Sequence, residues 1–127
     1  MFYKNNEHKR RFVESIQSVK ISITKLEPQF ISSLYLLTSN SMLWRRAEIS
    51  VGWDKIMFKN IELKSISPDG YTLCKVAHDI YENTSHIKFN DLHNNKLISD
   101  VMLKLIMRAI EIRRNGSSAF LSASSSS

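Results

Sequence analysis

Cys74 and His78 are the pair of side chains in this sequence whose types and spacing could do chemistry. A spacing of four residues places both on one face of a helix, where an imidazole can activate a thiol or where both can bind a metal ion. A structural metal site usually takes four ligands, however, and the other histidines, His8, His86 and His93, follow no ligand motif. A buried cysteine beside a histidine at the rim is the commoner arrangement. We therefore predict no catalytic residue, no metal site and no cofactor.

The motifs of nucleotide chemistry and of acid-base catalysis give no stronger signal. The glycines Gly52, Gly70 and Gly116 lie too far apart to form a loop that binds phosphate. The carboxylates fall at predicted helix starts or on a solvated helix face, where acidic groups belong for structural reasons. The sequence therefore favours a protein that is not an enzyme.

Basic side chains beside aromatic ones are the remaining candidates for a functional site. They are Lys9, Arg10 and Arg11, which share the expected solvated face of the first helix with His8; Trp44, Arg45 and Arg46; Trp53; and Arg113 and Arg114. An aromatic ring next to cations can stack on bases and bind phosphates. A charge run is more often a solvated helix face, and an aromatic residue at helical spacing is more often core. The clusters fall in separate predicted elements, so only folding can gather them into one site for a partner or a nucleic acid.

Composition sets the class of protein to which these residues belong. The 127 residues are 43% apolar, which suits one ordinary domain with a single core. Lys and Arg total 18 against 12 Asp and Glu, so the net charge of +6 favours an acidic or phosphate-bearing partner. The chain has one cysteine, a polar start and no apolar stretch long enough to span a bilayer, so we predict a cytoplasmic protein without a membrane segment.

Apolar periodicity predicts a mainly α fold of four to five helices in a single domain over residues 1–116. Helices are expected near 7–18, 28–37, 42–47 with Ser41 as its cap, 68–83 after the start signal Ser67-Pro68, and 94–114. The last two are expected to pack antiparallel, and the last one is expected to organise the fold. The helix at 28–37 is apolar around most of its circumference, so it forms either the core or a homodimer interface. Alternation near Val19–Ile23 and Ile56–Leu63 allows a small two-stranded β element. The Ser-rich residues 117–127 are typical of a flexible or vector-derived tail.

Residues 51–66 show poor periodicity and are predicted to form a loop that faces a partner, with Trp53 and Phe58 as anchors. Short motifs elsewhere form a pattern across residues 2–114. They are Phe2-Tyr3 with Glu7-His8-Lys9 and Phe12, the stretch 30–37, Tyr71-x-Leu-x-Lys-Val-Ala with Ile80-Tyr81, and Ala109-Ile110-Glu111-Ile112-Arg113. Together they resemble a family of small uncharacterised proteins, a domain of unknown function, from low-GC Gram-positive bacteria and their phages. The sequence departs from that family in its middle, residues 44–66, and in having Tyr81 in place of a tryptophan.

The resemblance implies a mostly helical phage or prophage accessory protein, and it carries over no functional residue. Small phage proteins of this kind often inhibit a host machine, including nucleic-acid-guided defence systems such as CRISPR. The positive charge argues against acidic mimicry of DNA. We therefore expect a non-enzymatic protein that binds and modulates a bacterial protein or nucleoprotein complex in the host cytoplasm. A small basic DNA- or RNA-binding protein that uses the same charges is the alternative.

Overall fold

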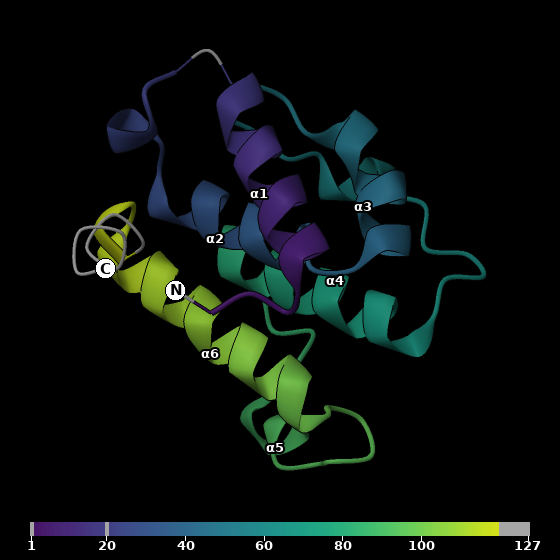
Figure 1. The fold of residues 1–127 in the computed structure, drawn as a ribbon. Helices are drawn as coiled ribbons and strands as arrows, with labels where there is room; N and C mark the ends of the chain where they lie inside the picture. Colours follow the sequence, from purple (N-terminus) through teal and green to yellow (C-terminus); the bar gives the residue numbers. More distant parts are fainter. Residues whose placement is uncertain (1, 20, 120–127) are drawn as a thin grey trace.

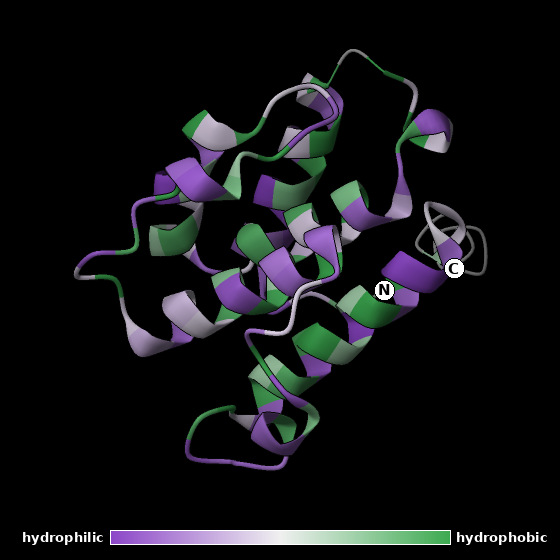
Figure 2. Cartoon of the chain, turned by 180° about the vertical axis from the view of Figure 1, so that it is seen from behind, coloured by the Kyte–Doolittle hydropathy of each residue, from purple (hydrophilic) through white to green (hydrophobic). Residues whose placement is uncertain are grey.

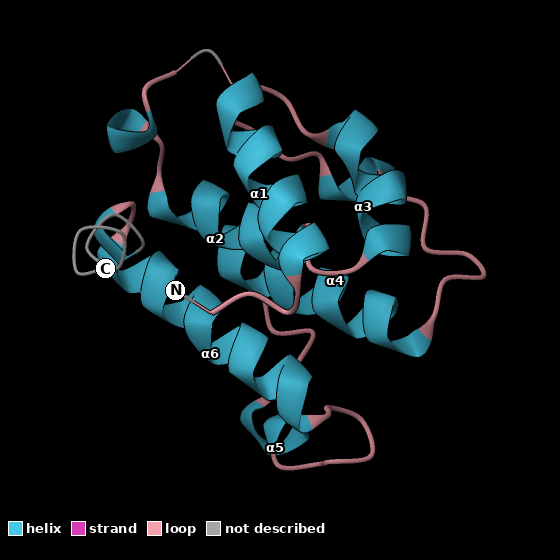
Figure 3. Cartoon of the chain, viewed as in Figure 1, coloured by secondary structure: helices cyan, strands magenta, loops and turns pink. Residues whose placement is uncertain are grey.

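The regular structure of residues 2–19 and 21–119, which the computed structural model describes, consists of helices (Figures 1 and 3). The α-helices in these ranges are α1 (Asn6–Ser18), α2 (Pro28–Leu37), α3 (Ser41–Ala47), α4 (Pro68–Glu82), α5 (Phe89–Leu92) and α6 (Asp100–Asn115). Short 3-10 helices, η1 (Ile23–Lys25), η2 (Glu48–Ser50) and η3 (Phe58–Asn60), lie in the connections. The predicted mainly α fold is confirmed, whereas most of the predicted Ser-rich tail, from residue 120 onward, lies outside the described residues. Within them, no helix is both long and apolar enough to cross a bilayer.

Polar side chains cap the N-terminal ends of α1, α3, α4 and α6. Asn5, Asn40, Ser67 and Ser99 each accept a hydrogen bond from a backbone N–H in the first turn of α1, α3, α4 and α6. Two predicted starts were wrong. Asn40 rather than Ser41 caps α3, and α6 begins after Ser99 because that hydroxyl, and not residue 94, supplies the cap.

The central helix of the fold is α2, and not α6 as the sequence suggested. Each side chain from Phe30 to Leu37 is at most 1% exposed. The helix packs against α4 and α6, with α1 and α3 alongside (Figure 1). Within it, Ser32 Oγ donates to the carbonyl of Ala109 in α6, and Ser33 Oγ donates to that of Ala77 in α4 at 3.1 Å. Residues 30–37 of α2 are thus covered within one chain, so they form core and not a homodimer interface.

The helices α4 and α6 run in the same general direction, opposite to α2 (Figure 1), so the expected antiparallel pair is not formed. Asn83, at φ 60°, ends α4 in the left-handed conformation. The chain then returns along α4 through residues 83–99, which we call the return segment, before α6 begins. A connection of this length can travel back to the start of its own helix, and a short one cannot.

The small β element predicted near Val19–Ile23 and Ile56–Leu63 is not formed in the described residues (Figure 3). One antiparallel bridge joins Val51 to Ile56, η3 lies within the second segment, and η1 begins at the last residue of the first. The apolar side chains there pack separately onto the helical core, so the alternating residues never meet a partner strand.

Candidate functional site

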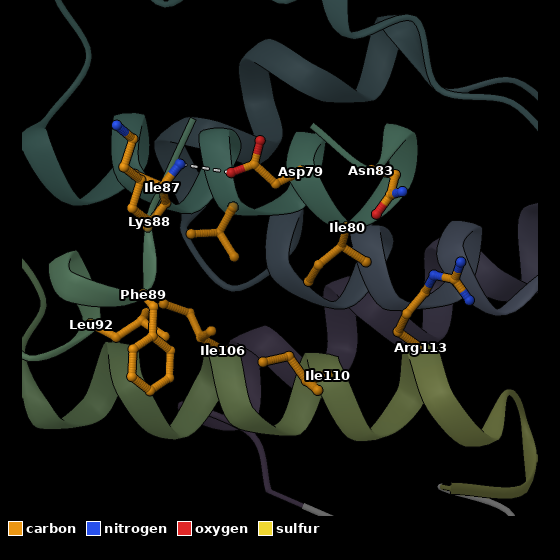
Figure 4. Close-up of a pocket in the computed structure, with 11 residues that line it drawn as sticks. Asp79, Ile80, Asn83, Ile87, Lys88, Phe89, Leu92, Ile106, Ile110 and Arg113 are labelled. Carbon is orange, nitrogen blue, oxygen red and sulfur yellow. Dashed lines mark hydrogen bonds between the residues drawn. The ribbon is translucent and has the colours of Figure 1, made fainter. Parts of the chain in front are cut away.

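An apolar groove of about 460 Å³ lies between α4, the return segment and α6 (Figure 4). Its lining comes from three places: Val76, Asp79, Ile80 and Asn83 of α4 and its end; Ile87, Lys88, Phe89 and Leu92 of the return segment; and Ile106, Ile110 and Arg113 of α6. Its volume falls in the range of protein ligand sites, roughly 300–1,000 Å³. Figure 2 shows apolar residues along α6 in the view from behind.

Helical spacing explains why these side chains converge. Steps of three and four residues place Ile106, Ile110 and Arg113 on one side of α6. Because the two helices run the same way, the C-terminal end of α4 lies towards Arg113 (Figure 4). Two apolar members are uncovered, since Phe89 is 75% exposed and Ile110 is 49% exposed. The groove thus presents apolar surface to solvent.

Asp79 holds the return segment against α4. Its carboxylate accepts hydrogen bonds from the backbone N–H groups of His86 and Ile87, at 2.8 and 2.7 Å, and from the Thr84 hydroxyl at 2.6 Å. The ring nitrogen Nδ1 of His86 lies 2.7 Å from Oδ1 of the same carboxylate. Partial burial raises the pKa of Asp79, but these hydrogen bonds outweigh it, so the pKa lies below its ordinary value. The carboxylate positions the groove wall and is occupied by internal partners.

Two cations flank the groove. Lys88 lies at one end, on the outer side of the return segment with its ammonium group directed away from the apolar floor, and Arg113 lies at the other end (Figure 4). Neither the ammonium group of Lys88 nor the guanidinium group of Arg113 forms a hydrogen bond or an ion pair within the described part of the chain. The two charged groups of the groove lining that have no partner in the described residues, Lys88 and Arg113, are therefore both positive.

The basic cluster of α1 is largely engaged within the chain. Arg10 contacts Glu7 at 2.5 Å and Glu14 at 3.6 Å, and Arg11 Nε donates to the carbonyl of Thr38 at 2.7 Å. Lys9 remains exposed. Of the three predicted site residues in α1, the two arginines thus have structural partners.

His8 was assigned to the same solvated face, and this was wrong, because its side chain is 0% exposed. Its Nε2 lies 2.8 Å from the carbonyl oxygen of Tyr35, and its Nδ1 accepts from the N–H of Lys4 at 3.0 Å. The ring packs edge-on against Tyr3, with centroids 5.2 Å apart. Burial lowers the pKa of His8 to about 4, although the hydrogen bond to Tyr35 opposes the shift. The imidazole is thus a neutral core group.

The cluster around α3 divides in the same way. Trp44 is partly buried against the core, and Arg45 is exposed. Arg46 Nη1 donates to the carbonyls of Glu62 and Lys64, at 2.7 and 2.9 Å, and so fixes the chain that leads into α4. Arg45 is the member of this cluster left to face a partner.

The predicted partner-facing loop has one exposed anchor and one buried one. Trp53 is 58% exposed, and its neighbours Ile49 and Met57 are 87% and 52% exposed. Phe58 is only 8% exposed and stacks on His78 with ring centroids 4.7 Å apart. These side chains form a second exposed apolar region, and Ile49 lines a cavity of about 280 Å³ together with Trp44.

The predicted site residues do not form one patch. The helices α1 and α3 and the end of α6 lie in different parts of the molecule (Figure 1). Arg113 is the predicted residue that lines the groove, while Arg114 is exposed beside it at the helix end. The groove itself was not predicted from the sequence, because no local pattern shows that residues 87–92 form its third wall. The spacing of Ile106, Ile110 and Arg113 was the available signal.

Cys74 and His78 do not form a reactive pair in the described residues. Cys74 is 3% exposed, and burial raises the pKa of its thiol to about 11. His78 Nε2 pairs with Glu82, and its ring stacks between Phe58 and His86. Across residues 2–19 and 21–119, no group of three or more histidine, cysteine or acidic side chains is placed to hold a metal ion.

Comparisons with family models, with curated proteins and with solved structures find no match for this chain. The resemblance to uncharacterised proteins of Gram-positive bacteria and their phages therefore stays a prediction. The function has to be argued from the groove and from the charges around it.

Proposed function

We propose that this protein is a non-enzymatic binding protein that docks on a bacterial protein or nucleoprotein complex through the groove between α4, the return segment and α6. The observation that carries the proposal is the exposure of Phe89 and Ile110, at 75% and 49%, on the two sides of one apolar groove. Contiguous exposed apolar surface marks an interaction site, because a partner that covers it removes it from water.

Two observations support binding over catalysis. The thiol of Cys74 is buried and protonated, so it is a poor nucleophile. The carboxylate that lines the groove, Asp79, is occupied by the return segment. The groove therefore offers contact surface, with no activated base or nucleophile among its lining residues.

A protein partner fits the groove better than a bare nucleic acid does. Aromatic and arginine side chains beside aliphatic ones, as in Phe89, Ile110 and Arg113, are the usual anchors of protein interfaces. The role that we propose, inhibition or modulation of a host complex, draws on the phage-family resemblance. The net charge of +6 is consistent with an acidic surface on that complex.

The test is an affinity capture from a Gram-positive bacterial lysate, with and without nuclease, using the wild-type protein and Ile110→Asp. Met107→Asp is the matched control, because Met107 lies on the same helix at 56% exposure and lines no part of the groove. We expect the wild-type protein to capture a defined protein whose recovery does not depend on nuclease treatment. Ile110→Asp should capture about tenfold less of that protein, or less still, and Met107→Asp should capture as much as the wild type. Circular dichroism of both variants controls for folding. Equal capture by both variants, or recovery of nucleic acid without any protein partner, would contradict the proposal.

A further inference from the structure

We infer that the segment bound in the groove is a short amphipathic peptide with apolar side chains in its middle and carboxylates towards both ends. This inference rests on the proposed function and adds the chemistry of the partner. Three features of the groove carry it: its apolar floor, the cation at each end, and the absence of a free carboxylate among its lining residues.

The apolar floor selects the middle of the ligand. Ile80 and Ile106 lie on facing helices, and Ile110 and Phe89 extend the surface to solvent (Figure 4). An open groove between helices receives the apolar face of an amphipathic segment, whose aliphatic side chains replace water on the floor. From Ile106 to Arg113, α6 advances about 10 Å, which corresponds to roughly two turns of a helical ligand.

The charges select the two ends of the ligand. Lys88 and Arg113 flank the floor and have no internal partner in the described ranges. Asp79 does not compensate for them, because its oxygens already accept hydrogen bonds from Thr84, His86 and Ile87. A ligand with a carboxylate near each end therefore meets two unpaired cations, and a lysine there meets repulsion at both.

Other anionic ligands satisfy only part of this arrangement. A fatty acid has one carboxylate, so it can pair with Lys88 or with Arg113 but not with both. A single-stranded nucleic acid needs successive aromatic platforms and a continuous basic track, whereas Phe89 is the one aromatic residue of the groove lining. A peptide with two separated acidic groups matches both cations.

The test is an array of synthetic peptides of about ten residues, with varied Leu, Ile, Ala and Phe in the middle and with Glu, Ser or Lys at both ends. The full chain is applied, and the affinity of selected peptides is measured by fluorescence polarisation. We expect the Glu-flanked peptides to bind about tenfold or more tightly than the matched Lys-flanked ones. The double variant Lys88→Glu, Arg113→Glu should reverse that preference. The double variant Lys9→Glu, Arg45→Glu, which makes the same change in net charge outside the groove, should keep it.

Several outcomes would overturn the inference. One is that no peptide binds, and another is that Glu-, Ser- and Lys-flanked peptides bind equally well. A third is that dodecanoate or a single-stranded oligonucleotide displaces the Glu-flanked peptide at a lower concentration than unlabelled peptide does. The proposed function is judged separately, by the loss of the captured protein in Ile110→Asp. If Ile110→Asp loses the partner and the double reversal at Lys88 and Arg113 leaves capture unchanged, the groove is the binding site and the acidic ligand is wrong.

Discussion

His8 fastens the N-terminal segment to the core. Its Nδ1 accepts the N–H of Lys4, so Nε2 carries the proton and donates to the carbonyl of Tyr35. The phenol of Tyr35 in turn donates to the carbonyl of Phe2 at 2.6 Å. Protonation of Nδ1 would remove its acceptor function and bury a charge close to Lys4 and Arg11, which is why the neutral form dominates in the folded protein.

This arrangement predicts a loss of stability in mild acid. The folded-state pKa of His8, about 4, lies below its ordinary value of 6.5, so the unfolded chain binds the proton more readily between these values. The free energy of unfolding should therefore be highest above pH 6.5 and should fall by about 3 kcal/mol as the pH drops to 4. Urea unfolding at several pH values measures this slope.

The matched variants for that experiment are His8→Gln and His93→Gln. His8→Gln should be less stable at neutral pH but should lose much of the slope between pH 6.5 and 4. His93 is exposed, so its replacement should keep the wild-type slope. A slope that survives in His8→Gln would show that other groups cause the acid sensitivity.

The buried role of His8 was not predicted, although part of the signal was present. His8, Phe12 and Ser15 recur at steps of four and three residues, and all three are buried. A search for apolar periodicity recognises only Phe12 in this set and assigns polar His8 to the charged residues that follow it. A buried polar residue is identified by its hydrogen-bond partners, which come from other elements and are invisible in the local pattern.

At the scale of elements, the two serines of α2 fix how that helix sits between its neighbours. Ser32→Ala and Ser33→Ala should each lower the free energy of unfolding by about 1 kcal/mol, because each removes one buried hydrogen bond, to Ala109 or to Ala77. Ser18→Ala is the control, since Ser18 is exposed and bonds locally to Ser15 in α1. Chemical denaturation of the three variants gives the comparison. Equal effects at all three positions would show that burial adds nothing to these bonds.

Local signals predicted the existence of the main helices, and long-range packing decided the rest. Ser67 followed by Pro68 marked the start of α4 because a cap and a first-turn proline act on adjacent residues. The relative direction of α4 and α6 depended on the path of the return segment. That path is set by Asn83 at φ 60° and by contacts of Asp79 with residues several positions away, which no periodicity reveals.

At the scale of the whole molecule, the net charge of +6 is spread over separate surfaces. Binding to nucleic acid should accordingly be weak and unspecific, in the range of about 10⁻⁴–10⁻⁶ M near physiological salt. Reversing the charge of Lys9, of Arg45 or of Arg114 alone should weaken binding to a single-stranded oligonucleotide by only about two- to fivefold, because none of them belongs to a focused site. Fluorescence anisotropy at two salt concentrations tests this.

The groove variant Phe89→Ser is the control for that series and should leave the affinity for the oligonucleotide unchanged. If one of the three reversals abolished binding, a built nucleic-acid site would exist at that position, and the alternative function would displace our proposal. The sequence could give the total charge but not its distribution, because the partners of Arg10, Arg11 and Arg46 become neighbours only in the folded chain.

Residues 83–92 of the return segment contribute to the groove but not to the buried core. No residue from 83 to 92 is buried, yet this stretch forms one wall of the groove. The hydrogen bonds from Ser32 and Ser33 that join α2 to α6 and α4 do not involve it, and its contacts with the core come from Ile87 and Leu92. Substitutions, insertions or deletions in this stretch can therefore accumulate at little cost to folding while they reshape the ligand surface. The architecture lets related chains diverge in the target that they recognise on an unchanged scaffold.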